Sequence, residues 1–224
     1  MNKKLFYTIS VLIGAAVMLF TANKFFGKKT KLVGSVLFVG DSITAIEHNK
    51  KPIKTTYPNI IKKKIVNKKT IIDVLAVVGK NTAWQLESLT NKLKTNTYDR
   101  IYIYGGINDI FSSIPRQKVV QNIQKMVDLI RKKGAEAYVI IGYDSQHFMD
   151  EYKLTSTRKV ADKTSILNFK KKYIDYQNSI SFGIRGATIV DKFSIPSSMT
   201  FDGIHPTPQG QEIIAEILLK NLKT

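Results

Sequence analysis

The sequence VLFVGDSITAIEH, residues 36–48, decides how the rest of the chain is interpreted. Its first four residues are apolar, as in a strand buried inside a sheet, and the run ends abruptly at Gly40, Asp41 and Ser42. A small hydroxyl side chain directly after a buried strand has two explanations. It can form a turn that caps a helix, or it can be a nucleophile placed at the end of the strand. Ser42 alone does not distinguish them.

Apolar runs alternate with helical patterns from residue 32 onward. We expect strands at 33–39, 70–77, 100–104, 137–142 and 187–191, and helices at 57–66, 82–93, 115–133, 166–181 and from 208. Thr82 and Gln85 have the spacing of a capping box at the start of the second helix. Nearly continuous apolar strands between helices indicate a parallel sheet covered on both faces. We therefore predict an α/β fold, a flavodoxin-like three-layer α/β/α sandwich with a parallel sheet of about five strands.

The composition fits one domain with an N-terminal appendage. The 224 residues are 43% hydrophobic and include no cysteine, which excludes disulfides, thiolate nucleophiles and Cys-based metal sites. The formal net charge of +18 has two explanations, attraction to an anionic surface or a solvated lysine-rich surface. We favour the solvated surface, because the lysines form short runs within amphipathic patterns and no nucleic-acid-binding motif accompanies them.

Residues 1–31 are expected to form a membrane anchor and a basic linker, separate from a domain at 32–224. Residues 5–22 carry no charge and are flanked by lysines, and as a helix they would span about 27 Å, near the thickness of a hydrocarbon core. A cleaved signal peptide is less favoured, because Phe20 fits poorly three positions before a cut after Ala22. A helix buried in the core of a soluble domain is the least favoured of the three explanations, because the flanking lysines would have to enter that core.

The orientation of this single-pass anchor is left open by the sequence. More lysines lie after the span than before it, which by the positive-inside rule would put the domain in the cytoplasm. Short N-terminal anchors, however, often export the domain that they carry. We expect a membrane protein whose folded domain lies outside the cytoplasm.

Small and polar residues come directly after three of the predicted strands. They are GDS at 40–42, VGK at 78–80, which contains Gly79, and GGIND at 105–109. Because the carboxyl ends of parallel strands share one edge of a sheet, where ligands bind, we expect these loops to lie close together. A fourth loop, FDGIHP at 201–206, precedes the last helix and can reach the same edge.

The residues in these loops predict nucleophilic catalysis. A serine hydroxyl needs an adjacent base at neutral pH, and His205 can take the proton of Ser42. Asp202, three residues before His205, can reach Nδ1 of the imidazole within one turn and fix its tautomer. The candidate oxyanion donors are the backbone N–H groups of Ser42 and Gly79 and the side-chain amide of Asn108.

Taken in order, GDSIT (40–44), Gly79, GIND (106–109) and DGIH (202–205) resemble the motifs of the SGNH hydrolases, the GDSL-type lipase/esterase family. The resemblance covers nearly all of residues 33–224. It implies the same fold and the roles given above for the five site residues. It also implies an esterase, lipase, thioesterase or carbohydrate-ester deacetylase that uses no metal. Around Gly79 only the glycine and its position after a strand agree with the family.

We therefore expect a membrane-anchored serine esterase that hydrolyses a carboxylic ester, acetyl by preference, of a lipid or glycan through an acyl-enzyme. The same residues would make an acyltransferase if the acyl acceptor were not water. A catalytically silent module of the same fold, binding a glycan or lipid, and a basic nucleic-acid-binding protein are the alternatives. We expect no cofactor, no metal and no nucleic-acid partner, and the sequence leaves the oligomeric state open. The polar stretch at 143–165 is a candidate lid or pocket wall.

Overall fold

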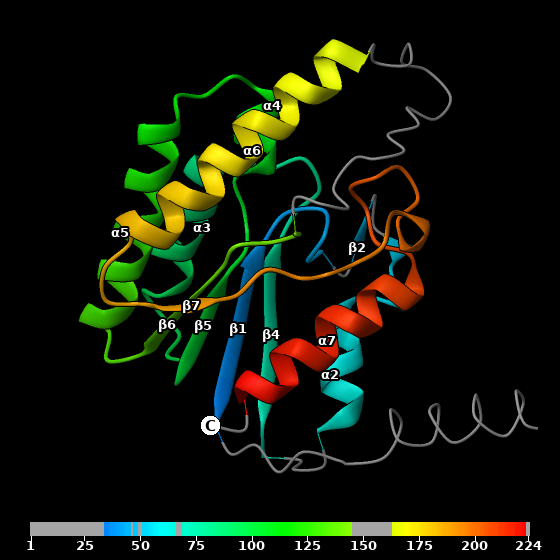
Figure 1. Ribbon diagram of the computed structural model, residues 1–224. Coiled ribbons are helices and arrows are strands. Elements are labelled where there is room, and N and C mark those ends of the chain that lie inside the picture. The colour runs from blue at the N-terminus through cyan, green and yellow to red at the C-terminus, as the bar shows by residue number, and fades with distance from the viewer. Residues whose placement is uncertain (1–33, 46, 49–50, 66–68, 145–162, 223–224) are drawn as a thin grey trace, which may run out of the picture.

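The computed structural model describes residues 34–45, 47–48, 51–65, 69–144 and 163–222. They form an α/β fold around a five-stranded parallel sheet, in the order β4-β1-β5-β6-β7 (Figure 1). The strands are β1 Ser35–Gly40, β4 Ile71–Ala76, β5 Arg100–Ile103, β6 Glu136–Ile140 and β7 Thr188–Val190. All five predicted strands are present, and the first strand lies inside the sheet, as in other doubly wound folds of this order.

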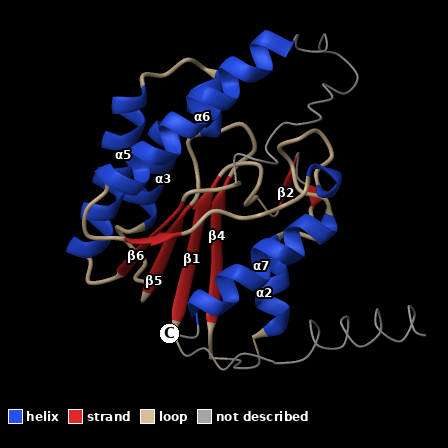
Figure 2. Cartoon of the chain, in the orientation of Figure 1, coloured by secondary structure: helices blue, strands red, loops and turns tan. Residues whose placement is uncertain are grey.

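Helices cover both faces of the sheet, so the prediction of three layers is confirmed (Figure 2). One face carries α2 Tyr57–Lys64 and α7 Pro208–Leu222. The other carries α3 Thr82–Lys92, α5 Arg116–Lys132 and α6 Lys163–Gly183. Four short elements were not predicted, because each has too few residues to show a periodic pattern. They are β2 Glu47–His48, β3 Lys51–Pro52, α4 Ile107–Phe111 and the 3-10 helix Ser197–Met199.

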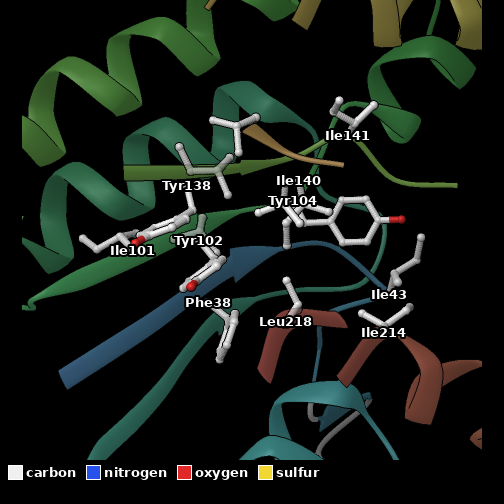
Figure 3. Close-up of a cluster of buried hydrophobic side chains, with 14 of the residues drawn as sticks. Phe38, Ile43, Ile101, Tyr102, Tyr104, Tyr138, Ile140, Ile141, Ile214 and Leu218 are labelled. Atoms are coloured by element: carbon white, nitrogen blue, oxygen red, sulfur yellow. The ribbon is translucent and has the colours of Figure 1, made fainter. Parts of the chain in front are cut away.

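Strand β1 is apolar along its length because helices cover both of its faces. Its residues 36–39 are each at most 1% exposed. Phe38 lies beside Tyr102 of β5, with ring centroids 5.2 Å apart, and Tyr102 stacks on Tyr138 of β6 at 4.4 Å (Figure 3). Such aromatic pairs contribute about 0.5 to 1.5 kcal/mol each beyond the area that they bury. They hold the central strands in register, and with them the loops at their carboxyl ends.

The capping box predicted at Thr82 and Gln85 is wrong. Helix α3 is capped one residue earlier, where the side chain of Asn81 accepts a hydrogen bond of 3.1 Å from the backbone N–H of Trp84. Because Asn81 accepts the hydrogen bond from the first turn of α3, the hydroxyl of Thr82 is available to another partner. That partner, Asp109, belongs to the short helix α4, which follows β5.

The predicted anchor and linker, residues 1–31, lie outside the described residues, as does most of the 143–165 stretch. Among the residues that the structure describes, no helix is both long and apolar enough to cross a membrane. The anchor therefore stays a prediction.

Candidate active site

Ser42 lies in a tight turn at the carboxyl end of β1. The carbonyl oxygen of Asp41 accepts hydrogen bonds from the backbone N–H groups of Thr44 and Ala45, at 3.1 and 2.9 Å. A Cβ on Gly40 would lie 2.2 Å from the hydroxyl oxygen of Thr44, so only glycine permits a turn this close. The turn buries Asp41 and leaves Ser42 half-buried, at the surface of a cavity.

His205 and Asp202 meet Ser42 from the loop that precedes α7. The hydroxyl oxygen of Ser42 lies 2.9 Å from Nε2 of His205, and Nδ1 of His205 lies 2.7 Å from Oδ2 of Asp202. The other carboxylate oxygen of Asp202 accepts hydrogen bonds from the backbone N–H groups of Ile204 and His205, at 3.0 and 2.8 Å. With its proton on Nδ1, the imidazole donates to Asp202 and offers Nε2 as an acceptor to Ser42.

Each member of the pair of His205 and Asp202 stabilises the charged form of the other. The hydrogen bond to Asp202 raises the pKa of His205, although burial of the ring acts in the opposite direction. Burial opposes ionisation of Asp202, but the hydrogen bonds from the side chain and backbone of His205 lower its pKa overall. Asp202 is therefore ionised at neutral pH and stabilises the imidazolium that forms when His205 takes a proton.

Gly79 lies in the loop after β4, and Asn108 lies in the short helix α4 after β5, at the same edge of the sheet. The side-chain amide of Asn108 donates to the carbonyl of Lys80 at 3.1 Å and lies 3.4 Å from a carboxylate oxygen of Asp41. Asn108 therefore contacts the residues that directly adjoin Gly79 and Ser42. Gly79 is exposed and has a positive φ of 77°, with open space where a side chain would begin. A substrate can thus approach its backbone closely.

A buried network that the sequence did not reveal joins α4 to the start of α3 and to α5. Asp109, next to Asn108, accepts hydrogen bonds from the backbone N–H and the hydroxyl of Thr82, at 2.9 and 2.6 Å. Asn122 of α5 donates to the same hydroxyl at 3.1 Å. All three side chains are buried. The only sign of this network in the sequence is the polar Asn122 on the apolar face of a helix. That position does not indicate which residues Asn122 contacts.

A cavity of about 470 Å³ opens beside Ser42 and His205. Ile53, Val78 and Phe201 form part of its wall. None of these three was predicted as part of a site, because only the three-dimensional arrangement places them there. Among the described residues, no group of three His, Asp or Glu side chains is arranged to hold a metal ion.

A family model described as the GDSL-like Lipase/Acylhydrolase family matches residues 38–213 of the chain. The chain belongs to this family. It is similar to an arylesterase of Vibrio mimicus, with 23% identity over 189 residues that cover 84% of this chain and 87% of the relative. With this evidence the protein is a serine ester hydrolase of the GDSL type.

Solved structures of esterases share the fold of this GDSL esterase. The psychrotrophic esterase EstA of Pseudoalteromonas sp. gives a TM-score of 0.62 at 15% identity, covering 84% of this chain and 96% of its own. A catalytic variant of Axe2, an acetylxylan esterase of Geobacillus stearothermophilus, gives 0.64 at 14% identity, covering 88% and 97%. At such low sequence identities, these structural similarities establish a shared fold and nothing more.

Proposed function

We propose that Ser42 is the nucleophile of this GDSL esterase, His205 its general base and Asp202 the residue that orients His205. The observation that carries this proposal is the chain of two short contacts, 2.9 Å from Ser42 to His205 and 2.7 Å from His205 to Asp202. A hydroxyl at hydrogen-bond distance from an imidazole, itself oriented by a carboxylate, is the arrangement that activates serine in acyl transfer.

The reaction proceeds in two steps through an acyl-enzyme. The hydroxyl oxygen of Ser42 attacks the ester carbonyl carbon while Nε2 of His205 takes the hydroxyl proton. The carbon–oxygen bond to the alcohol then breaks, and the alcohol leaves with the proton from His205. Water then attacks the acyl-enzyme and loses a proton to His205. As the bond to Ser42 breaks and the acid departs, His205 returns that proton to the oxygen of Ser42.

The oxyanion of each tetrahedral intermediate is stabilised by donors from three loops. We assign this role to the backbone N–H groups of Ser42 and Gly79 and to the side-chain amide of Asn108. The hydrogen bond from Asn108 to Lys80 supports the assignment, because it holds the amide against the loop that contains Gly79. Preorganised donors of this kind typically contribute about 3 kcal/mol each to lowering the barrier.

The substrate that we propose is a small acyl ester, acetyl by preference, of a lipid or glycan. The structural neighbours of the chain include an acetylxylan esterase, which supports an acetyl group. We further propose that residues 5–22 anchor the enzyme in a membrane, with the folded domain outside the cytoplasm. The uncharged stretch and its flanking lysines support the anchor. Digestion of intact cells with an added protease tests the orientation, since only an external domain is cleaved.

The catalytic assignment is tested with the full-length protein and its Ser42→Ala, His205→Ala and Ser88→Ala variants. Hydrolysis of p-nitrophenyl acetate and butyrate is measured for each. The first two variants should lose at least about a thousandfold in kcat, because a catalytic triad fails when one member is removed. Ser88 lies on α3 and should be neutral. Equal rates in all four proteins would refute the assignment, and faster turnover of butyrate would refute the preference for acetyl.

A further inference from the structure

Phe201 is a large aromatic residue that the fold leaves two-thirds exposed, at 66%. Its backbone is nevertheless fixed, because its N–H donates to the carbonyl of His205 at 2.8 Å. The neighbouring residues Thr200 and Pro206 form a bridge that closes the same loop. The loop that supplies the imidazole therefore also presents an aromatic ring to solvent at the wall of the cavity.

The cavity itself suits uncharged groups. Its volume is about 470 Å³, and none of the described residues that line it is Lys, Arg, Asp or Glu, although the chain has a net charge of +18. Its polar side chains are hydroxyls, the imidazole and the amide of Gln211. That amide is already engaged, since it accepts from the backbone N–H of Tyr57 at 2.8 Å and donates to the carbonyl of Ile43 at 3.2 Å. A charged group placed here would lose its hydration without gaining a partner.

Phe201 lines the cavity from the same loop as His205, the residue that protonates the departing alcohol in the proposed mechanism. In the proposed mechanism the alcohol receives its proton from Nε2 of His205, so it leaves along the imidazole. Phe201 is joined to His205 through the backbone hydrogen bond of their shared loop. Because Phe201 lines the same cavity as Ser42 and His205, the alcohol part of the ester is the part that we place against its ring.

We propose that Phe201 is a platform on which the alcohol part of the substrate stacks, and that this part is an uncharged ring with an apolar face. Two sources present such a face, the flat side of a pyranose and an aryl ring. A flexible alkyl alcohol has no flat face to stack and would gain little from Phe201. This inference rests on the proposed roles of Ser42 and His205 and extends them to substrate choice.

The test measures kcat/KM of the full-length enzyme on phenyl acetate, a mono-O-acetyl methyl pyranoside and ethyl acetate. The variants are Phe201→Ala, Phe201→Tyr and Phe182→Ala. Phe182 of α6 is the matched control, because it is 75% exposed and does not line the cavity. Phe201→Ala should lower kcat/KM about tenfold on at least one ring ester and leave ethyl acetate within about twofold. Phe201→Tyr should restore the rate, and Phe182→Ala should change nothing.

The pattern of loss identifies the source of the ring. A loss confined to the pyranoside supports a sugar, a loss confined to phenyl acetate supports an aryl alcohol, and a loss on both supports their shared apolar face. Equal losses on all three esters, or no loss on either ring ester, would overturn the proposal. Failure of the catalytic assignment is distinguishable, because Ser42→Ala would then retain wild-type rates whatever the Phe201 variants do.

Discussion

The hydroxyl oxygen of Ser42 lies 2.9 Å from Nε2 of His205, although 163 positions separate the two residues in the chain. Gln211 of α7, the helix that follows the His205 loop, holds the turn of Ser42, because its amide donates to the carbonyl of Ile43. Tyr143 supports the other loop by donating to the carbonyl of Ile204 at 2.7 Å. Hydrogen bonds from α7 and from Tyr143 thus support both sides of the contact.

Replacing Asp202 with Asn should change the pH dependence of the reaction. His205 must be neutral to accept a proton, so kcat/KM falls as the pH drops through the pKa of His205. Asp202 raises that pKa above its ordinary value of 6.5. In the variant the acid limb should therefore move to lower pH, while kcat falls by roughly two to four orders of magnitude. A pH–rate profile with an unmoved acid limb would contradict the role of Asp202.

The hydroxyl of Thr82 should matter for the oxyanion donors, although it does not reach the substrate cavity. Thr82→Val removes its hydrogen bond to Asp109 and should lower kcat more than it raises KM, with a loss of about 1 to 3 kcal/mol in unfolding free energy. Thr82→Ser should restore both. Thr90→Val is the matched control on α3, since Thr90 is exposed and donates to the carbonyl of Leu86 within its own helix. If valine and serine behave alike at position 82, the hydroxyl has no such role.

Two glycines with positive φ should respond differently to alanine. A Cβ on Gly106 would lie 2.4 Å from the ring of Tyr176, whereas a Cβ on Gly79 would meet open space. Gly79→Ala should therefore cost only about 1 to 2 kcal/mol of backbone strain. Gly106→Ala should cost clearly more, because the ring must also move. Urea unfolding of both variants measures this difference in unfolding free energy. Equal losses of unfolding free energy would show that the ring of Tyr176 moves aside at little cost.

Asp41 should make stability depend on pH near neutrality. Burial raises its pKa to about 6, from 3.8 in a solvated chain. The folded state therefore binds the proton of the Asp41 carboxyl more tightly than the unfolded chain does. The stabilisation of the folded state by this proton is fully present below pH 3.8 and is lost as the pH rises through about 6. Asp41→Asn, which cannot ionise, should gain roughly 2 to 3 kcal/mol relative to wild type between about pH 4 and pH 8. A constant difference across this range would mean that Asp41 titrates normally.

The sheet was predictable from sequence because its strands are apolar runs, most of them ending at small or polar residues. Asp202 and His205 could be predicted to lie together because one turn joins them, and Ser42 could be placed with them only because the ordered motifs of all four segments indicated one shared site. Thr82 was misassigned as a cap, since local spacing cannot show that Asp109 lies within reach. Exposure of Phe201 was equally hidden, because a phenylalanine beside a site motif can as well belong to the core until the fold places it.

Labelling with a serine-directed phosphonate tests the central assignment most directly. Full-length wild type and Ser42→Ala are incubated with the phosphonate, and adducts are located by peptide mass spectrometry while p-nitrophenyl acetate hydrolysis is measured. We predict a single adduct on Ser42 in the wild type that forms as activity disappears, and none in the variant. Loss of activity with the adduct on another residue, or an unmodified Ser42 in an inactivated enzyme, would contradict the assignment.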